Sequence, residues 1–270
     1  MIPTYATAFA IAILVAALII LSLSRISLPR KSGFEALEDP EAAQAYDRIS
    51  RWPQFRMLRR MVAGKLARYQ TEGSLPAPAC PGGQGRQVAD IGCGPGYLAA
   101  LIAQRYPHLH VVGFDSSCEM IRTARLNAAA LDLSDRVEFR EGDVSSLPVP
   151  EGTLDFAVST LSLHHWSDPG RALAEFQRVL KPGGQLLIFD LRRDPRRFFH
   201  WLMRFAQSWV VPGALRRIHE PLGSLLSSYT VAEVENLFAQ SPFHEWKVEG
   251  GPAWFFAWAR KRLPAPSAGG

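Results

Sequence analysis

The stretch VADIGCGPGYLAA, residues 88–100, places three glycines and a proline between a strand-like run and a helix-like run. Glycine in such a turn has an entropic cost, so it is favoured where something must approach the backbone closely. In an open α/β sheet, ligands bind where a strand ends and its helix begins. The stretch therefore predicts the first strand, the first helix and the ligand-binding turn of an α/β fold.

Strand and helix patterns alternate along the rest of the chain. The predicted strands are 87–92, 109–115, 137–143, 154–160 and 185–191. The predicted helices are 97–106, 116–131 and 170–180, with Ser116 and Asp168 expected as the N-caps of the second and third. Short loops between alternating elements favour a doubly wound, mostly parallel sheet. A further helix at 230–240 precedes two more predicted strands, 243–251 and 253–261.

The composition allows one large core and leaves the class of partner open. The 270 residues are 47% hydrophobic and 20% charged, which suits a single α/β domain with appendages. The three cysteines are widely spaced and indicate neither a disulfide framework nor a metal site. A formal net charge of +5 is compatible with nucleic acid, an anionic membrane or no charged partner.

The first 30 residues are predicted to form a membrane anchor. No charged side chain occurs from Ala6 to Ser24, and a helix of that length spans about 28 Å, close to the bilayer's hydrocarbon thickness. A cleaved signal peptide is the alternative, but no Lys or Arg precedes the apolar run. Arg25, Arg30 and Lys31 follow it, so a single-pass protein with its catalytic domain in the cytoplasm is expected.

Three further segments complete the predicted organisation. Residues 31–86 are expected to hold a helical extension followed by a Pro/Gly-rich linker, because apolar positions repeat every three or four residues only up to residue 69. Residues 87–263 form the predicted α/β domain, and 264–270 a disordered tail.

An acidic residue accompanies each of the first three predicted strands. The glycine spacing is G-x-G-x-G, which departs from the G-x-G-x-x-G of dinucleotide sites. Asp90 precedes the glycines, and Asp115 ends the second strand, where a carboxylate can accept both hydroxyls of a ribose. Asp143 is placed to meet an adenine amino group. The structural alternatives are a helix N-terminal charge for Asp115 and a polar turn residue for Asp143.

Three segments resemble one known family: VADIGCGPGYLAALIA, VVGFDSSCEMI and the run from VEFREGD to LLIFD. Residues 44–191 are similar to the class I S-adenosylmethionine-dependent methyltransferases, within the branch of the ubiquinone/menaquinone-biosynthesis C-methyltransferases and related small-molecule enzymes. The resemblance implies a seven-stranded, Rossmann-like methyltransferase sheet and S-adenosylmethionine as cofactor. The N-terminal apolar segment and residues 192–228 depart from the family pattern. The identity of the methyl acceptor therefore cannot be inferred from any single relative.

The resemblance also implies a cofactor-binding set that follows the ends of the strands, together with the tyrosine of an early AYDR element. Its members are Tyr46, Asp90, Gly92, Cys93, Gly94, Gly96, Asp115, Ser116, Asp143, Val144, Ser159 and Thr160.

The acceptor side of the predicted site is less well defined. Methyl transfer needs a base only if the acceptor loses a proton as it attacks. His164 and His165 follow the fourth strand and are the candidate bases. The alternative is that they only shape the loop or bind the substrate by hydrogen bonds. His219 and Tyr229 are weaker candidates. In this family branch the insert 192–228 tends to cover the acceptor site.

The aromatic and basic insert bears on the choice of acceptor. Its large apolar side chains are flanked by the Arg pairs 192/193, 196/197 and 216/217, which suits a helix at a membrane interface. A core helix with a solvated basic rim is the alternative. We therefore expect methylation of a small, hydrophobic, membrane-partitioning acceptor. A tethered methyltransferase of a soluble metabolite or thiol, a protein- or RNA-modifying enzyme and a non-catalytic scaffold are the alternatives, and no nucleic-acid partner is expected.

Overall fold

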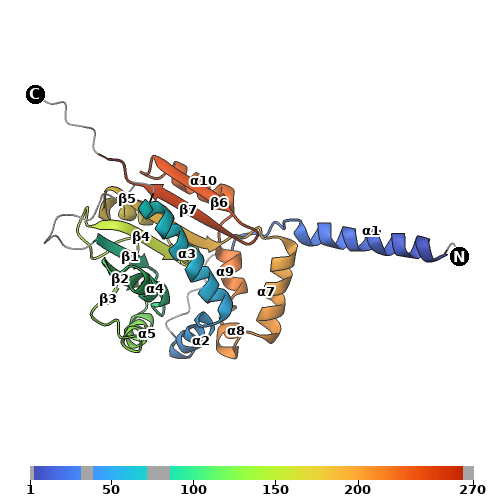
Figure 1. Cartoon of the computed structure of the whole chain (residues 1–270), viewed down its shortest axis with the longest axis horizontal. Coiled ribbons are helices and arrows are strands. Elements are labelled where there is room, and N and C mark those ends of the chain that lie inside the picture. Colours follow the sequence, from blue (N-terminus) through green and yellow to red (C-terminus); the bar gives the residue numbers. More distant parts are fainter. Residues whose placement is uncertain (1–2, 32–38, 72–85, 264–270) are drawn as a thin grey trace, which may run out of the picture.

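A computed structural model of the chain describes residues 3–31, 39–71 and 86–263 (Figure 1). Most of the predicted linker, residues 72–85, and the predicted disordered tail, residues 264–270, lie outside the described residues.

The described part of the chain is organised around one seven-stranded sheet with the order β3-β2-β1-β4-β5-β7-β6. The strands are β1 (Arg86–Ile91), β2 (Leu109–Asp115), β3 (Val137–Glu141), β4 (Leu154–Thr160), β5 (Leu180–Leu191), β6 (Glu245–Gly250) and β7 (Trp254–Arg260). The first five pair in parallel, and β7 is antiparallel to both β5 and β6. The predicted doubly wound, mostly parallel sheet is confirmed.

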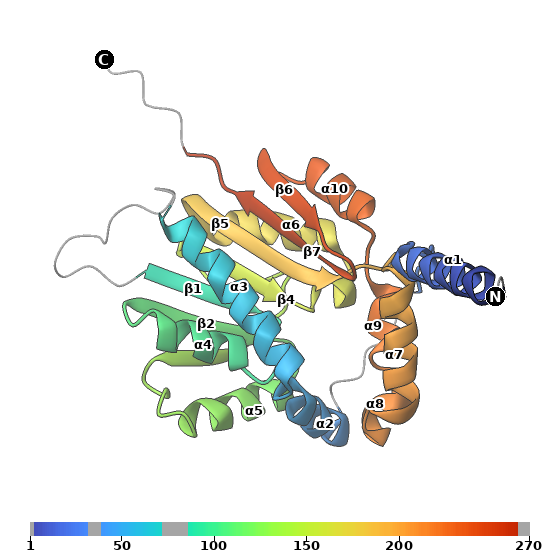
Figure 2. The ribbon, with the colours of Figure 1, turned by 45° about the vertical axis from the view of Figure 1, so that its right-hand side comes forward.

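Helices cover both faces of this sheet and the edge where its parallel strands end (Figures 1 and 2). The helix α1 (Pro3–Leu23) instead projects away from the sheet (Figure 1). The other helices are α2 (Pro40–Ser50), α3 (Pro53–Thr71), α4 (Tyr97–Arg105), α5 (Cys118–Ala129), the 3₁₀ turn η1 (Leu163–His165), α6 (Pro169–Val179), α7 (Arg197–Trp209), α8 (Gly213–Arg217), α9 (Leu222–Ser227) and α10 (Val231–Ala239).

Two hydrophobic layers hold the helices against the sheet. On one face, Phe176 of α6 and Phe238 of α10 are fully buried with side chains of the central strands. On the other face, α3, α4 and α5 contribute a second buried cluster that includes Leu66 and Ile102. A strand covered on both faces must be apolar on both faces, which explains why β4 reads as a continuous buried run.

A third, smaller cluster joins α2 to α8 above the ends of the strands. It contains Ala42, Ala45 and Ile49 of α2 with Ala214 and Leu215 of α8. The helix α2 precedes the first strand, whereas α8 lies in the insert between β5 and β6. Their packing turns the N-terminal extension and the 192–228 insert into one cap over the ligand-binding edge of the sheet.

The start of α5 differs from its prediction by one residue. Ser117, rather than Ser116, is the N-cap, and its hydroxyl accepts a hydrogen bond from the Met120 amide. The Ser117 amide donates to Asp115, which extends the turn after β2 and leaves Ser116 exposed. The Asp168 N-cap of α6 is confirmed, since its carboxylate accepts from the Arg171 amide.

The predicted N-terminal helix is present as α1, and its last turn is attached to the beginning of α7. The Arg197 amide donates to the Ser24 carbonyl, and the Ile26 amide donates to the Pro195 carbonyl. In the part of the chain that the structure describes, however, no helix reaches the combined length and hydropathy that a bilayer crossing requires. The predicted transmembrane span is therefore not confirmed.

The insert forms three helices, and its arginines do not all behave as predicted. None of the described residues of α7 is buried, so the alternative of an ordinary core helix is wrong. Arg192 and Arg193, expected to face a membrane, are buried instead. Arg193 donates to the carbonyls of Leu28 and Ser228 and pairs with Glu233 of α10, which fastens the chain before α2 to the end of the sheet.

The turn between β1 and α4 depends on glycine at its first position. Gly92 has φ +71°, and a Cβ there would lie 2.3 Å from Oγ of Ser162 in the loop after β4. Gly152 has a similar φ of +63° but no heavy atom within 4 Å of the same position. Both glycines therefore have a positive φ that disfavours other residues, but only at Gly92 would an added Cβ also clash with a neighbouring side chain.

We predict that Gly92→Ala lowers the free energy of unfolding by about 1–3 kcal/mol more than Gly152→Ala does, because strain and a clash add at Gly92. Urea denaturation of both variants measures the difference. Equal losses in the two variants would show that Ser162 moves away without cost and that only the positive φ matters.

Candidate active site

Asp115 joins the end of β2 to the glycine turn. Its two carboxylate oxygens accept hydrogen bonds from the amides of Gly94, at 2.8 Å, and Ser117, at 3.0 Å. Burial raises the pKa of Asp115, and these backbone amides oppose that shift. The carboxylate therefore holds the turn in place, which is a structural role beside the predicted one. Each oxygen keeps a lone pair with which to accept a ribose hydroxyl.

Asp90 is a fully buried carboxyl group at the end of β1. Neither of its side-chain oxygens has a hydrogen-bond partner within the described residues. Burial raises the pKa of Asp90 to about 7, with repulsion from Asp115 adding to the shift and the nearby Ala99 amide opposing it. A buried carboxylate without a partner is costly, so this group is suited to receive a cation or a hydrogen-bond donor from a ligand.

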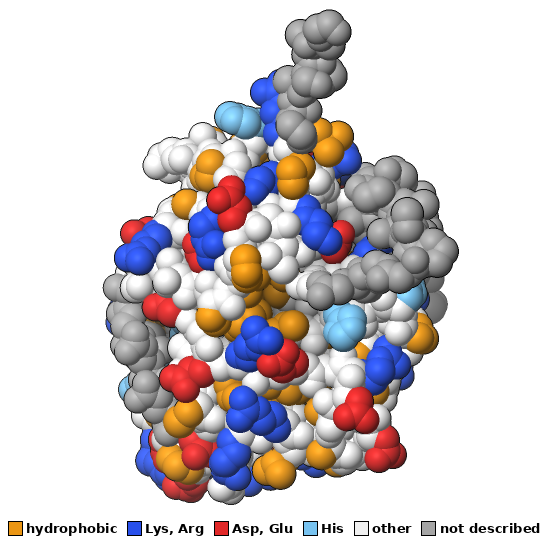
Figure 3. All heavy atoms as spheres, turned by 90° about the vertical axis from the view of Figure 1, so that its left-hand side faces the viewer, with side chains coloured by type: hydrophobic (Ala, Val, Ile, Leu, Met, Phe, Trp, Pro, Cys, Tyr) orange, Lys and Arg blue, Asp and Glu red, His pale blue; other side chains and the backbone are white. Residues whose placement is uncertain are grey.

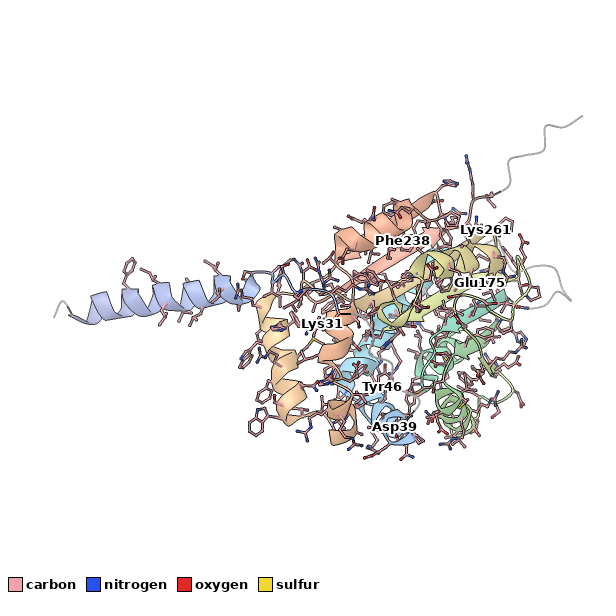
Figure 4. All side chains as sticks on the ribbon, turned by 180° about the vertical axis from the view of Figure 1, so that it is seen from behind. Lys31, Asp39, Tyr46, Glu175, Phe238 and Lys261 are labelled. Atoms are coloured by element: carbon pink, nitrogen blue, oxygen red, sulfur yellow. The ribbon has the colours of Figure 1, made fainter. Side chains whose placement is uncertain are left out.

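Tyr46 of α2, labelled in Figure 4, lies next to Gly94 of the glycine turn. A Cβ built on Gly94 would have one side-chain atom near it, Cε1 of Tyr46 at 3.7 Å. Burial raises the pKa of the Tyr46 phenol, and the nearby carboxylates of Glu220 and Asp115 add to the shift. Tyr46 therefore lies between the glycine turn and the α8–α9 part of the cap.

A polar network that the sequence did not reveal fixes α2 on this turn. Asp47 accepts hydrogen bonds from the Tyr97 hydroxyl at 2.9 Å, the Asn127 amide at 2.9 Å and Arg51 at 2.7 Å. Asn127 also donates to the carbonyl of Pro95 inside the turn. In the sequence, only the position of Asp47 next to Tyr46 pointed to a role for Asp47. Its partners Tyr97 and Asn127 lie 50 and 80 residues away, so the network has no local sequence pattern.

The remaining predicted cofactor residues are placed less directly. The Asp143 carboxylate accepts from the Ser145 amide at 2.7 Å, so it stabilises its own turn, as the structural alternative proposed. The Ser159 hydroxyl is buried and donates to the Ile91 carbonyl between β1 and β4. Cys93 is buried and burial raises its pKa, while Val144 and Thr160 are partly buried beside the same edge.

His164 lies in η1, directly after β4, and is paired with a carboxylate that sequence reasoning missed. Its Nδ1 lies 2.8 Å and 2.9 Å from the two oxygens of Asp190, near the end of β5. Both side chains are buried. The amides of His164 and Leu191 also donate to Asp190, so the carboxylate is held on several sides.

His165, the second predicted base, is placed differently. Its ring packs against that of His164 with a centroid distance of 4.1 Å. The side chain of His165 is exposed, whereas that of His164 is enclosed between η1 and the cap. The structure thus separates two histidines that the sequence could not distinguish.

A surface hollow of about 490 Å³ lies elsewhere, beside β2, β3 and the end of α5. His110, Arg125 and Asp135 are among the residues that line it, and no predicted cofactor or catalytic residue does. Strand ends and helix starts, rather than this hollow, define the candidate site.

The residues at the strand ends fit S-adenosylmethionine. Asp90 offers an unpartnered buried carboxyl group for a cationic amine, Gly94 leaves its backbone open apart from Tyr46, and Asp115 retains lone pairs for hydroxyl groups. When bound, this cofactor supplies an electrophilic methyl group on a sulfonium. The buried carboxylates, the glycine turn and Tyr46 are the groups of this chain that would hold it.

Comparison with known proteins supports S-adenosylmethionine as the methyl donor. Residues 89–188 match the family model described as a methyltransferase domain. The ubiquinone/menaquinone biosynthesis C-methyltransferase of Syntrophotalea carbinolica is 31% identical over 167 residues, which cover 62% of this chain and 68% of that protein. The chain therefore belongs to the class I S-adenosylmethionine-dependent methyltransferases, a family whose methyl donor is S-adenosylmethionine.

Two further proteins define the extent of the similarity. Demethylmenaquinone methyltransferase of Thermus thermophilus is 33% identical over 127 residues, covering 47% of this chain and 57% of that protein. A methyltransferase structure from Aquifex aeolicus has a TM-score of 0.56 at 22% identity, covering 82% of this chain and 98% of that one, and it shows the same fold. The chain spans about half the length of several curated relatives that it matches.

We predict that Asp90→Asn changes the pH dependence of stability in the absence of ligand. Because the pKa of Asp90 is raised in the folded protein, the folded state binds more protons than the unfolded state between about pH 4 and pH 7. The wild type should therefore lose stability relative to Asp90→Asn as pH rises through that window, by at most about 1.4 kcal/mol per pH unit.

Urea denaturation of both proteins at pH 5, 6, 7 and 8 measures this difference. The same variant should bind S-adenosylhomocysteine more weakly at pH 8, because its amino group loses an anionic partner. Parallel stability curves for the two proteins would show that Asp90 is not protonated in the folded state and would remove the basis for this role.

Proposed function

We propose that this protein transfers the methyl group of S-adenosylmethionine to a small, lipophilic acceptor at the cytoplasmic surface of a membrane. The donor half of the proposal is supported by family membership and by the buried carboxylates around the glycine turn. The acceptor half is supported by relatives named for demethylmenaquinone, ubiquinone/menaquinone and 2-phytyl-1,4-naphthoquinone. A quinone-like ring compound is therefore the acceptor class that we favour.

The exposed face of α7 is the single observation that carries the membrane part of the proposal. Its exposed apolar side chains repeat every three or four residues, and its two tryptophans are 64% and 79% exposed. The set is Phe198, Trp201, Leu202, Phe205 and Trp209, with Val210 directly after the helix. A helix with such a face beside cationic groups suits the boundary between lipid headgroups and acyl chains.

The position of α7 strengthens this interpretation. In space, α7 begins beside the end of α1, where the Arg197 amide donates to the Ser24 carbonyl (Figures 1 and 2). The described apolar side chains of α1 are also exposed. The opposite side of the molecule shows basic and acidic side chains intermixed (Figure 3). The contrast favours one lipid-facing side, formed by α1 and α7, with the cap of the candidate site beside it.

Labelling a total host lipid and metabolite extract tests the reaction. The full-length protein in detergent is incubated with methyl-labelled S-adenosylmethionine, and the products are separated into lipid, aqueous and macromolecular fractions. We expect label in the lipid fraction and roughly a tenfold or greater loss of it in Asp115→Asn, because an amide replaces the carboxylate that accepts hydroxyl groups.

Other distributions of label would change the proposal. Label only in the aqueous fraction would support a tethered methyltransferase of a soluble metabolite or thiol. Label only in the macromolecular fraction would support protein or RNA modification. Because Asp115 also holds the glycine turn, the unfolding midpoint of Asp115→Asn is measured in parallel, and the comparison is made only at temperatures where both proteins are folded.

We predict that α7 delivers the protein to its acceptor. The double variant Trp201→Ser/Trp209→Ser should reduce methylation of the lipid-fraction acceptor roughly fivefold when that acceptor is embedded in phosphatidylglycerol-containing vesicles, because two exposed indoles no longer enter the interface. Turnover of the same acceptor dispersed in detergent should not change.

The matched control removes exposed leucines from a surface remote from α7. Leu126→Ser/Leu131→Ser alters side chains that are 59% and 43% exposed near the end of α5, and it should leave both rates unchanged. An equal effect of the two double variants on the vesicle assay would contradict a specific lipid contact by α7. Extraction of host membranes with alkaline carbonate then tests whether α1 holds the protein in the bilayer.

A further inference from the structure

The His164–Asp190 pair is more organised than a loop-shaping role requires. The acceptor-only carboxylate of Asp190 lies within hydrogen-bond distance of Nδ1, so Nδ1 carries the proton of the neutral ring and Nε2 carries the lone pair. Nε2 is buried and has no hydrogen-bond partner among the residues that the structure describes. An oriented imidazole with a free Nε2 is the arrangement in which histidine accepts protons from a reacting group.

The charged groups around His164 favour a proton on its ring. Burial lowers the pKa of His164. The charge and the hydrogen bond of Asp190, together with the charge of Glu220, raise this pKa by more than burial lowers it. Glu220 lies in the connection between α8 and α9. Arg30, in the segment before α2, lowers the pKa of His164, and the ring of His165 packs against that of His164 within η1. The net shift is above the ordinary value, so two carboxylates stabilise the imidazolium that proton transfer would form.

Glu220, a partly buried carboxyl group, is a second acidic neighbour of His164. Burial raises its pKa, while the Ser224 hydroxyl, which donates to Oε2 at 2.5 Å, and the charge of His164 oppose the rise. Glu220 also faces Tyr46, whose ring lies on the glycine turn. Tyr46 thus has two carboxylates as neighbours: Asp115, at the candidate cofactor site, and Glu220, beside His164.

The pair is also close to the place where the methyl donor is expected. Ser162, two residues before His164, packs so closely on Gly92 that no Cβ fits there. The Ser162 hydroxyl accepts a hydrogen bond from Trp166, which closes the η1 loop around the histidine. The η1 loop that carries His164 therefore packs, through Ser162, on the turn that forms the candidate cofactor site.

We propose that Nε2 of His164 accepts a proton from the methyl acceptor, with Asp190 as its positioning residue, and that the acceptor is therefore one that loses a proton on methylation. This inference rests on the proposed function and specifies its substrate class. A hydroxyl, a thiol or the acidic ring carbon of a phenolic compound fits. A tertiary amine or a thioether, which would become a fixed cation, does not.

The proposed step balances without an additional reactant. The acceptor's electron pair forms a bond to the methyl carbon, and the bond from that carbon to the donor sulfur breaks, with its electrons remaining on sulfur. For a hydroxyl or a thiol, the acceptor proton moves to Nε2 as the bond forms. For a phenolic ring carbon, Nε2 takes the hydroxyl proton as the bond forms, and the ring then regains its aromaticity when the carbon loses its proton and the oxygen takes one up, so that one proton in total leaves the acceptor. The imidazolium later returns its proton to water.

A first experiment examines the pair without any acceptor. Nitrogen-15 NMR of the full-length, histidine-labelled protein bound to S-adenosylhomocysteine should show His164 protonated at Nδ1 and titrating above the ordinary histidine range. Asp190→Asn should lower that titration point. The opposite tautomer, or a titration that Asp190→Asn leaves in place, would overturn the proposal.

A second experiment measures methylation of the lipid-fraction acceptor between pH 5 and pH 9. His164→Asn keeps an amide group able to donate to Asp190 but lacks a base, so kcat should fall about 100-fold or more, with binding of S-adenosylhomocysteine unchanged. Added imidazole should restore part of the rate in His164→Ala. The wild-type rate should rise with pH through the titration point of His164, and Asp190→Asn should move that rise to lower pH.

The outcomes separate this inference from the proposed function. If the wild type labels no lipid-fraction acceptor, the proposed function fails. If the wild type labels it and His164→Asn does so at the same rate with the same pH profile, the inference fails and the proposed function stands. His244→Ala, on the exposed turn before β6, is the matched histidine control and should change neither rate nor profile. A methylated product carrying a fixed positive charge would also overturn the inference.

Discussion

The conformation of the backbone between β1 and α4 is the constraint on which the rest of the site depends. Gly92, Gly94 and Gly96 all have positive φ, and the Asp115 carboxylate holds the Gly94 amide from the neighbouring strand. This turn brings three strand ends, the start of α4 and Tyr46 of α2 to one place. A side chain at Gly92 would displace the loop after β4, and with it the histidine that we assign to the acceptor.

The site is divided between a rigid edge and a cap of different origin. The sheet contributes carboxyl groups at the ends of β1, β2 and β5. Among the described residues, Asp90 at the end of β1 is buried without a hydrogen-bond partner, and that cost is the physical sign of a binding site. The cap contributes Tyr46 from α2, before the sheet, and Glu220 from the insert between β5 and β6. No residue of α7, which belongs to the same insert, is buried.

Local sequence signals predicted the elements well and their partners poorly. The glycine turn, the boundaries of β2 and β4 and the Asp168 cap follow from patterns within about ten residues, and all are confirmed. The cap of α5 moved to Ser117 because Asp115 hydrogen-bonds to the amide that follows Ser116. Arg192 and Arg193 were expected at a membrane surface, but carbonyls and carboxylates distant in the sequence bury them instead.

By itself, the sequence determined the succession of strands and helices along the chain and the position of the glycine turn, because periodicity and glycine spacing act over short distances. Its resemblance to a known family indicated the cofactor. Tertiary structure alone decided which polar groups meet. Asp190 lies 26 residues from His164, and Asp47 lies 80 residues from Asn127, so neither pairing has a local signature. Parallel pairing of β4 with β5 brings their ends to the same edge, and that geometry selected His164 rather than His165 for the buried carboxylate.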